Sequence, residues 1–341
     1  MEPRGMNERR SIARTHMARA LWYAKEGQVE LRPEPVHHPK SHEAQIKTEF
    51  SGVSRGTERL ILSGAVPESE WAHMKAPLQC GEFPFPVKYG YCATGVVKIG
   101  PNELIGRRVF CLHPHQDVFN APLKMLVQVP ECVAAKRAIL AANMETALNG
   151  HWDAGTGPGD TIAVVGGGIV GLLVAAIACG LTGSQTHVID PNPARSDIIS
   201  ALGAVPHASP PEGLDADVVF HASATDDGLV AAINLCGREG RVVEMSWFGD
   251  RTSTIELGGA FHRKRLQLIS SQVGQVAPSR RARWSYRRRL EKALDLLADP
   301  IFDRFVTEEI AFEEAPERLP AMLMGPPHGL APVIRYSGDA K

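Results

Sequence analysis

The sequence predicts an α/β fold with two parts, a doubly wound parallel sheet and an antiparallel, barrel-like β domain. The first half is rich in β-branched residues and is broken by glycine and proline, which is typical of short antiparallel strands. From about Asp160, short apolar strands alternate with helical segments, which indicates βαβ units covered on both faces. A glycine-rich turn follows the first of these strands.

The 341 residues suffice for two domains, since a domain commonly holds about 100 to 200 residues. We expect a flexible tail over 1–17, which lacks the apolar segment of a secretory signal. An antiparallel domain that binds the substrate should occupy 18–145, and a parallel-sheet domain 146–285. The last segment, 286–341, should return to the antiparallel domain.

Composition and charge indicate the class of protein. Hydrophobic residues make up 44% and charged residues 22%, the ordinary balance of a globular protein. The net charge of -1 gives no general attraction to nucleic acid or to an anionic membrane. The longest apolar stretch, 169–179, is shorter than the roughly 18 to 20 residues that span a bilayer. Six widely spaced cysteines without a C-x-x-C pair favour reduced, mostly buried thiols, and we expect a cytoplasmic protein.

The elements are predicted in chain order from periodicity and turn residues. The antiparallel domain should hold strands within 20–36, 43–58, 93–112 and 124–130. The second part should hold strands at 160–166, 186–191, 217–223, 240–249 and 266–274, with helices at 168–183, 194–204 and 225–237. A further helix over 279–300 should end at Pro300, followed by short strands.

Gly166, Gly168 and Gly171 form G-x-G-x-x-G between a buried strand and a helix, the context in which this motif binds a dinucleotide. The first glycine permits a tight turn, the second lets the backbone approach the pyrophosphate, and the third lets helix and strand pack closely. Ile169 and Val170 open the helix, whose N-terminus faces the phosphates. The motif predicts a Rossmann sheet. The alternative is a glycine-rich turn with a helix-capping aspartate.

Asp190 ends the next strand, 19 residues after Gly171, where a carboxylate accepts hydrogen bonds from both ribose hydroxyls. It would repel a 2'-phosphate, so NAD is favoured over NADP. Arg195 could stack on the adenine or neutralise a phosphate, or it could be a solvated helix residue.

An antiparallel first domain, an inserted Rossmann domain and a returning chain end resemble the medium-chain dehydrogenase/reductase superfamily, from Ala18 to Tyr336. The phrases SGVSRGTERLILSG, GYCATGVV and ANMETALNG are similar to the branch that includes bacteriochlorophyllide a dehydrogenase, an NAD enzyme that oxidises a hydroxyethyl side chain to acetyl. The resemblance implies a GroES-like first domain, an NAD cofactor, and a homodimer that forms through the strand at 266–274.

Zinc enzymes of this superfamily hold the metal with a cysteine, the histidine of Gly-His-Glu, and a further cysteine or glutamate. The matching residues here are Ser54, Tyr91 and Ala142, whose hydroxyl, phenol and methyl groups cannot hold Zn²⁺ tightly. We therefore expect no zinc. His113 and His115 could together bind a metal, but two histidines two positions apart on a loop are more often surface residues.

Hydride transfer without zinc needs a side chain that polarises the substrate oxygen or exchanges its proton. Tyr91 is the first candidate, because it lies where the zinc histidine would point into the cleft. Ser54 and Thr57 could extend a proton relay, and Glu58 could be the base at its end or could orient Arg55. The alternatives are a packed aromatic ring for Tyr91 and turn residues for Ser54 and Thr57.

Further cofactor contacts are implied by the resemblance and by strand ends. Arg55 matches a residue that reaches the pyrophosphate, and Thr146 matches one near the nicotinamide. Ser223 and Trp247 follow strands at the carboxyl end of the sheet, where ligands of such sheets bind. Trp247 and Phe248 could line a flat, apolar substrate pocket or could pack in the core.

Arginines crowd the start of the predicted helix at 279–300, where cations oppose the helix dipole. They could contact an anionic substrate, a phosphate, or acidic residues of a neighbouring subunit, or they could form a solvated basic face. No aromatic platform accompanies them, so nucleic acid is not expected. The cluster comprises Arg280, Arg281, Arg283, Arg287, Arg288 and Arg289.

The residues together predict a zinc-independent, NAD-preferring oxidoreductase that interconverts a secondary alcohol and a ketone. Two alternatives stay open. One is an NAD(P)H-dependent enoyl or quinone reductase, and the other is a non-catalytic dinucleotide-binding protein that senses redox state or serves in an assembly.

Overall fold

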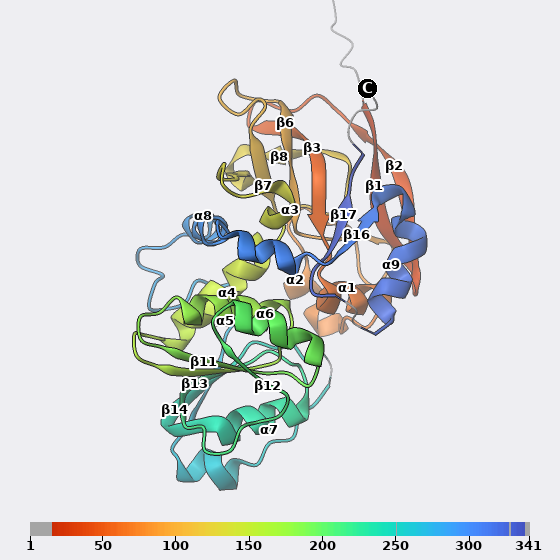
Figure 1. Ribbon diagram of the computed structural model, residues 1–341. Coiled ribbons are helices and arrows are strands. Elements are labelled where there is room, and N and C mark those ends of the chain that lie inside the picture. Colours follow the sequence, from red (N-terminus) through yellow and green to blue (C-terminus); the bar gives the residue numbers. More distant parts are fainter. Residues whose placement is uncertain (1–15, 250, 327–328, 338–341) are drawn as a thin grey trace, which may run out of the picture.

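The computed structural model describes residues 16–249, 251–326 and 329–337, and contains three sheets with helices packed around them (Figure 1). Two sheets form the upper part of the molecule in Figure 1, and a parallel sheet forms the lower part. The fold class predicted from the sequence is therefore confirmed: parallel and antiparallel sheets occupy separate parts of one chain.

The parallel sheet has six strands in the order β12-β11-β10-β13-β14-β15. The chain builds outward from the central strand to one side and then crosses to the other side, so the order reverses between β10 and β13. Ligands of doubly wound sheets bind outside the carboxyl ends of the strands at such a reversal. The strands are β10 (Thr161–Val165), β11 (Gln185–Ile189), β12 (Val205–His207), β13 (Ala216–His221), β14 (Cys236–Glu244) and β15 (Gln267–Ser270).

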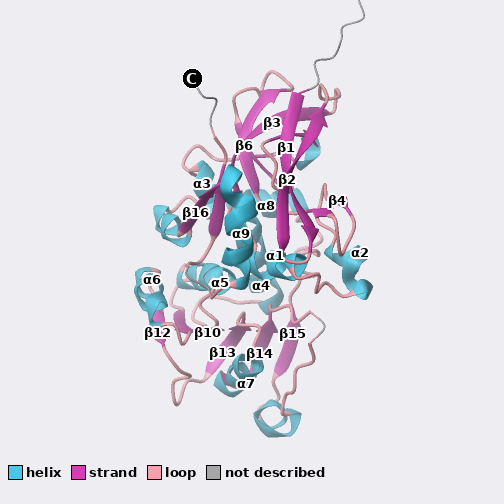
Figure 2. Cartoon of the chain, turned by 90° about the vertical axis from the view of Figure 1, so that its right-hand side faces the viewer, coloured by secondary structure: helices cyan, strands magenta, loops and turns pink. Residues whose placement is uncertain are grey.

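Helices cover both faces of this sheet because side chains of its buried strands alternate between two cores. Ile162 and Val164 face α4 (Ala141–Ala154), α5 (Ile169–Cys179) and α6 (Ser196–Ala201), whereas Ala163 and Val165 face α7 (Asp226–Leu235). Figures 1 and 2 show α7 on the side of the sheet that points away from the antiparallel part.

The antiparallel part consists of a four-stranded sheet, β2-β1-β5-β4, and a seven-stranded sheet, β16-β17-β3-β6-β7-β9 with β8 paired to β3. Among the described strands no pairing closes either sheet into a barrel. The strands are β1 (His16–Lys25), β2 (Gln28–Val36), β3 (Glu43–Gly52), β4 (Cys80–Gly81), β5 (Val87–Lys88), β6 (Ala93–Ile99), β7 (Arg108–Cys111), β8 (Val118–Pro122), β9 (Val127–Gln128), β16 (Glu308–Ala311) and β17 (Pro332–Arg335).

The chain end lies in the seven-stranded sheet, where β17 pairs antiparallel with β3 and parallel with β16. It thus returns to the part of the fold in which the chain begins, although the domain boundaries given above stay predictions. The remaining helices are α1 (Arg55–Leu62), α2 (Trp71–Met74), α3 (Ala135–Ala138), α8 (Tyr286–Leu296) and α9 (Ala315–Met324).

Several predicted boundaries are wrong. The helix expected over 279–300 is α8, which begins only at Tyr286 because the Ser285 side chain accepts a hydrogen bond from the Arg288 backbone N–H and caps it. The three-residue strand β12 was not expected, and β14 ends at Glu244 rather than continuing to residue 249. β1 begins at His16, inside the predicted tail, and residues 1–15 lie outside the described part of the chain.

The six cysteines form no disulfide, but only three of them are buried and two are exposed, so the expectation of mostly buried thiols is met only in part. No helix in the described part of the chain is both long and apolar enough to cross a membrane.

Candidate dinucleotide and catalytic site

The glycine-rich turn joins β10 to α5 at the carboxyl end of the parallel sheet. Gly166 has φ +108°, in the region that favours glycine, and a Cβ there would lie 2.8–2.9 Å from the backbone of Ala222 and Ser223. A Cβ on Gly171 would lie 1.9 Å from the Gly166 carbonyl oxygen. Gly166 and Gly171 therefore allow the turn, the helix and the sheet to pack closely, and a larger residue at either position would clash.

Gly168 differs from its two partners, because a Cβ there would have no neighbour within 4 Å. It is the N-cap residue of α5, and no side chain of this helix caps its first backbone N–H groups. The open space at a helix N-terminus suits an anionic group, since free N–H groups and the helix dipole both favour negative charge. The turn thus fits the pyrophosphate of a dinucleotide.

Asp190 follows β11 and lies against this turn. Its Oδ2 accepts a hydrogen bond from the Gly167 N–H at 2.6 Å, and its Oδ1 accepts one from the Asn192 N–H at 2.8 Å. Each carboxylate oxygen has a second acceptor site, so capacity is left for ribose hydroxyls. The Arg195 guanidinium donates to the Gly329 carbonyl oxygen at 2.8 Å, so it ties the Rossmann part to the returning chain end.

Tyr91, Ser54 and Thr57 lie together in the antiparallel part, as expected. The Tyr91 hydroxyl donates to Ser54 Oγ, and Thr57 Oγ1 lies 3.3 Å from both the Tyr91 and Ser54 oxygens. Ser54 immediately precedes α1, Thr57 lies in its first turn, and Tyr91 precedes β6, so helix start and strand start meet here. Burial raises the pKa of Tyr91, and the hydrogen bonds with Ser54 and Thr57 offset this only in part. The phenol is thus a proton donor near neutral pH.

Glu58 is fully buried, and its hydrogen bonds go to groups other than the Tyr91 hydroxyl. Its Oε2 accepts from the Tyr23 hydroxyl at 2.6 Å and lies 3.0 Å from His115 Nε2, and its Oε1 accepts from the Ser54 N–H at 2.7 Å. None of the hydrogen bonds found among the described residues joins this carboxylate to the Tyr91 phenol or to Arg55. Arg55 instead donates to the Gly325 carbonyl oxygen.

The expectation that His113 and His115 lie on the surface is wrong. His115 is 0% exposed between Glu58 and Ser51, and its Nδ1 lies 2.7 Å from Ser51 Oγ. His113 is 5% exposed and stacks on Phe119 with ring centroids 3.6 Å apart. Both rings fill the loop between β7 and β8, where neither periodicity nor composition signals burial.

The side chains at the positions of the family's zinc ligands do not suit this metal. The Tyr91 phenol donates a hydrogen bond to the Ser54 hydroxyl, and Ala142 in α4 offers only a methyl group. The described residues contain no group of three or more His, Cys, Asp or Glu side chains placed to hold a metal ion.

Thr146, Trp247 and Arg289, which the sequence also singled out, lie in α4, after β14 and in α8. Thr146 Oγ1 donates to the Ala142 carbonyl oxygen of its own helix. Trp247 is 38% exposed after β14, so core packing does not apply to it. Arg289 departs from the solvated arginine face, because it is 2% exposed and forms an ion pair with Glu145 at 2.9 Å that ties α8 to α4.

Sequence reasoning missed a polar chain at the ends of β13 and β14. His221 Nδ1 lies 2.6 Å from Glu244 Oε2, and His221 Nε2 lies 2.7 Å from the hydroxyl of Ser223. Parallel register places His221 directly beside Glu244 and beside Val165, the last residue of β10. The sequence did offer one signal for this chain: a histidine and a glutamate each end a buried strand, and the two strands are neighbours in the sheet.

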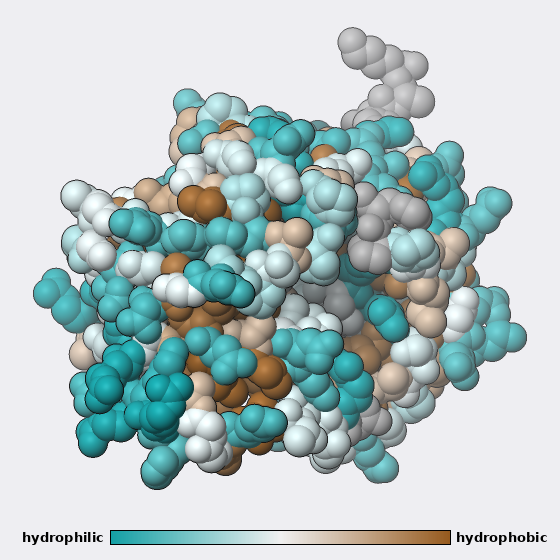
Figure 3. Space-filling view, turned by 60° about the horizontal axis from the view of Figure 1, so that its bottom comes forward, coloured by the Kyte–Doolittle hydropathy of each residue, from teal (hydrophilic) through white to brown (hydrophobic). Residues whose placement is uncertain are grey.

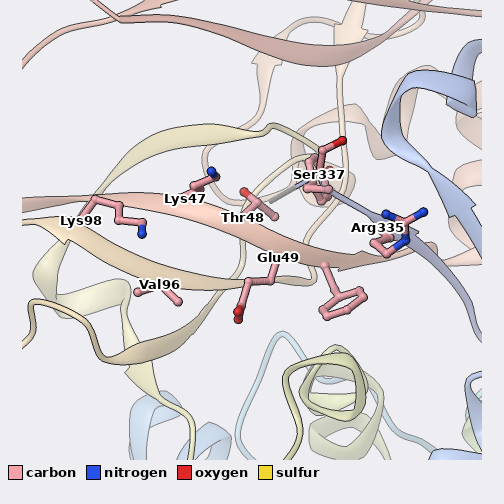
Figure 4. Close-up of a pocket in the computed structure, with 9 residues that line it drawn as sticks. Lys47, Thr48, Glu49, Val96, Lys98, Arg335 and Ser337 are labelled. Atoms are coloured by element: carbon pink, nitrogen blue, oxygen red, sulfur yellow. The ribbon is translucent and has the colours of Figure 1, made fainter. Parts of the chain in front are cut away.

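A separate pocket of about 380 Å³ lies on the antiparallel sheet, with Lys47, Lys98 and Arg335 at its rim (Figure 4). None of the predicted site residues lines it. The glycine turn at the carboxyl ends of the parallel strands therefore stays the candidate for the cofactor.

A Rossmann sheet with an open glycine turn, joined to an antiparallel part that receives both ends of the described chain, defines a two-part fold of dinucleotide-dependent dehydrogenases. No family model matches the chain. Curated relatives are dehydrogenases. The chain is 26% identical over 211 residues to 2-dehydro-3-deoxy-L-galactonate 5-dehydrogenase of Pseudoalteromonas atlantica, a match that spans 58% of each protein. It is 23% identical over 310 residues to D-guloside 3-dehydrogenase of Escherichia coli, 81% of this chain and 88% of that enzyme.

Solved structures of dehydrogenases share the fold of this chain. L-idonate 5-dehydrogenase of Escherichia coli has a TM-score of 0.77 at 13% identity and covers 95% of this chain and 100% of its own. 2R,3R-butanediol dehydrogenase of Bacillus subtilis has a TM-score of 0.73 at 18% identity and covers 93% and 99%. A Sinorhizobium meliloti dehydrogenase solved with NADP has a TM-score of 0.75 at 17% identity and covers 94% and 99%. The two-part dehydrogenase fold that the resemblance implies is therefore confirmed.

Proposed function

We propose that the protein is a zinc-independent oxidoreductase that interconverts a secondary alcohol and a ketone and prefers NAD(H). The observation that carries the proposal is the hydrogen-bonded Tyr91–Ser54–Thr57 cluster. By the sequence resemblance, Tyr91 matches the metal-binding histidine of the zinc enzymes. A bound dinucleotide supplies the hydride donor or acceptor. The chain's own residues must then bind the substrate, exclude water and handle one proton.

The phenol of Tyr91 would supply that proton. Because burial keeps it protonated, it can donate a hydrogen bond to a ketone oxygen and pass its proton to the developing alkoxide. For this step the Tyr91 proton would turn from Ser54 Oγ to the ketone oxygen, and the Ser54 or Thr57 hydroxyl would donate a hydrogen bond to the phenolate that forms. A proton taken up from water would then restore the phenol. In the oxidative direction the same groups carry the proton away from the alcohol.

Cofactor preference follows from Asp190, whose carboxylate suits a ribose with both hydroxyls free and opposes a 2'-phosphate. Gly166, Gly168, Ile169, Val170 and Gly171 would hold the pyrophosphate. The related sugar and polyol dehydrogenases act on secondary hydroxyls by their names, which supports a small alcohol substrate. The exposed Trp247 offers it a flat apolar surface.

The proposed homodimer would form at β15, the outer strand of the parallel sheet, whose Leu268 is 41% exposed. Figure 3 shows hydrophobic residues gathered between hydrophilic ones on one face of the molecule. The protein would work in the cytoplasm, without nucleic-acid or membrane partners.

The test is Tyr91→Phe, assayed with NAD and a panel of secondary alcohols, and with NADH and the matching ketones. Loss of the donor should lower kcat/KM by about 10² to 10⁴-fold, while the Kd of NADH stays within about twofold. An unchanged kcat/KM would refute the role of Tyr91. Zinc measured on the purified protein should be below about 0.1 per chain, and a value near one would contradict zinc independence.

The same replacement of zinc ligands also favours a reductase of activated C=C bonds, or a protein that binds a dinucleotide without turnover. Consumption of NADH with enones but no NADH formation with alcohols would identify the first. NADH binding without turnover on any carbonyl, alcohol or enone would identify the second.

A further inference from the structure

The parallel sheet continues beyond the glycine turn into β13 and β14. His221, Ser223 and Glu244 lie at the carboxyl ends of these two strands. Asp190 follows β11 on one side of β10, whereas His221 and Glu244 end β13 and β14 on the other side. The strands β13 and β14 lie beside β10 in the sheet (Figure 2). A dinucleotide with its adenosine ribose at Asp190 that spanned the reversal of strand order would therefore extend its second half over β13 and β14. This inference rests on the proposed dinucleotide site.

The hydrogen-bond donors and acceptors of this chain can be assigned in order. An ionised Glu244 only accepts, so the His221 proton lies on Nδ1, and Nε2 of the neutral ring accepts from the Ser223 hydroxyl. The Gly228 N–H donates to Thr225 Oγ1, which leaves the Thr225 hydroxyl to donate to Ser223 Oγ at 2.9 Å. Ser223 Oγ then has one acceptor site left and no free proton.

The surrounding backbone fixes the Ser223 side chain. A Cβ on Gly228 would lie 2.1 Å from Ser223 Oγ and 2.9 Å from His221 Nε2, so only glycine leaves room for this arrangement. Ala224 adopts φ +53°, a left-handed conformation rare for alanine, and its N–H donates to Ser246 Oγ at 3.0 Å. Ser246 in turn donates its N–H to Glu244 Oε1 at 2.7 Å.

The same order of groups activates nucleophilic serines. Here the Ser223 oxygen is bonded to both His221 and Thr225 and packs against Gly228, which leaves a single acceptor direction rather than an approach for an acyl carbon. An oriented acceptor suits a hydrogen-bond donor of a ligand that lies over the strand ends.

We propose that Glu244 and His221 are positioning residues that orient the Ser223 hydroxyl as the acceptor for a hydrogen-bond donor on the nicotinamide riboside half of the dinucleotide. The donor is either the carboxamide nitrogen or a ribose hydroxyl. Neither His221 nor Glu244 touches the ligand itself; they act through the hydroxyl.

Glu244→Gln tests the orientation with little change of shape. The Gln oxygen keeps the bond from the Ser246 N–H, so the amide NH₂ faces His221 Nδ1 and donates to it. The ring proton then moves to Nε2 and donates to Ser223, whose own proton turns outward. The acceptor becomes a donor and meets a donor on the ligand. Ser223→Ala removes the group altogether.

The readout is the Kd of NADH, ADP-ribose and ADP, measured by calorimetry on the full chain. Each variant should weaken NADH binding by about 3- to 10-fold, the worth of one hydrogen bond, and leave ADP binding within twofold. Loss of ADP-ribose affinity in parallel identifies the ribose hydroxyl as the donor, and its retention identifies the carboxamide. Glu49→Gln, at a partly exposed carboxylate paired with Arg108, is the matched control and should change none of the three dissociation constants.

Two outcomes would overturn the proposal. Unchanged NADH binding in both variants would mean that Ser223 does not contact the ligand, although the proposed function would stand. Equal weakening of NADH and ADP would mean that the variants distort the whole turn. If the wild-type protein binds none of the three ligands, the proposed function itself fails, which is a distinct result.

Discussion

Two histidine–glutamate pairs, each with a fully buried histidine, lie in different parts of this molecule and differ in what surrounds them. In the antiparallel part, Glu58 and His115 are both 0% exposed, and the Tyr23 hydroxyl and a backbone N–H also donate to the carboxylate. In the parallel part, Glu244 is 19% exposed, and its chain of hydrogen bonds ends at a serine hydroxyl with an acceptor site left.

The difference shows how context decides the role of the same chemical pair. Every polar atom around Glu58 is used within the fold, through His115 to Ser51 and on to the Tyr336 hydroxyl at 2.9 Å, which joins β3 to the returning chain end. Such a closed network can only hold elements together. The chain at His221 is open at one end, so it can act on a ligand.

The largest effect is expected from opening the closed network. Glu58→Ala would leave the Tyr23 hydroxyl, His115 Nε2 and the Ser54 N–H without their acceptor in a fully buried site. We expect a loss of about 3 to 5 kcal/mol in the free energy of unfolding, measured in urea. Glu49→Ala, which breaks an exposed pair with Arg108, should cost less than about 1 kcal/mol. An equal loss of unfolding free energy in Glu58→Ala and Glu49→Ala would mean that the closed network around Glu58 adds nothing beyond an ordinary surface ion pair.

The next effect separates two glycines of the turn. Gly171→Ala places a methyl group 1.9 Å from the Gly166 carbonyl oxygen, so helix and turn must separate, at a cost of about 1 to 3 kcal/mol of stability. Gly168→Ala meets no protein atom, so the unfolding free energy should change by less than about 1 kcal/mol.

Gly168→Ala, which should cost little stability, should have the larger direct effect on NADH binding. The methyl group of Gly168→Ala fills the space proposed for the pyrophosphate, so the Kd of NADH should rise relative to the wild type even though stability is kept. A Gly168→Ala protein that binds NADH normally would argue against the proposed position of the phosphates.

The sequence alone predicted the parts of this picture that depend on local pattern. The turn with Gly166, Gly168 and Gly171 follows from spacing between a strand and a helix, and Asp190 follows from the length of one βα unit. The meeting of Tyr91 with Ser54 followed from resemblance to a family, because only a known fold brings those distant positions together.

What escaped prediction depends on contacts between distant segments. The burial of His115 arises because Glu58, 57 positions away, supplies its acceptor. The His221–Glu244 pair arises from strand register, and strand order must be known before two strand ends can be paired. Neither pair leaves a periodic trace in its own segment, so single-segment reasoning assigned His115 to the surface and overlooked His221.

The smallest expected effect is the pH dependence of stability that arises from the buried His113 in the antiparallel part. Burial, with smaller contributions from the nearby Lys88 and His115, lowers the pKa of His113 to about 3, although a hydrogen bond to the Pro114 carbonyl oxygen opposes this. The ring is therefore neutral in the folded chain but titrates near 6.5 when unfolded. Because the unfolded state binds the extra proton below pH 6.5, stability falls as the pH falls from there toward about 3.

Between pH 7.5 and 5.5 this histidine alone should cost about 1.4 kcal/mol of unfolding free energy. His113→Phe keeps a ring against Phe119 and removes the titration, so its loss over the same interval should be smaller by about that amount. Comparing each protein with itself at two pH values cancels the constant effect of the substitution. His42→Gln, at an exposed histidine, should leave the pH dependence as it is in the wild type. An unchanged loss in His113→Phe would mean that water reaches His113 in the folded protein, and the antiparallel part would then be less closed than the network around Glu58 indicates.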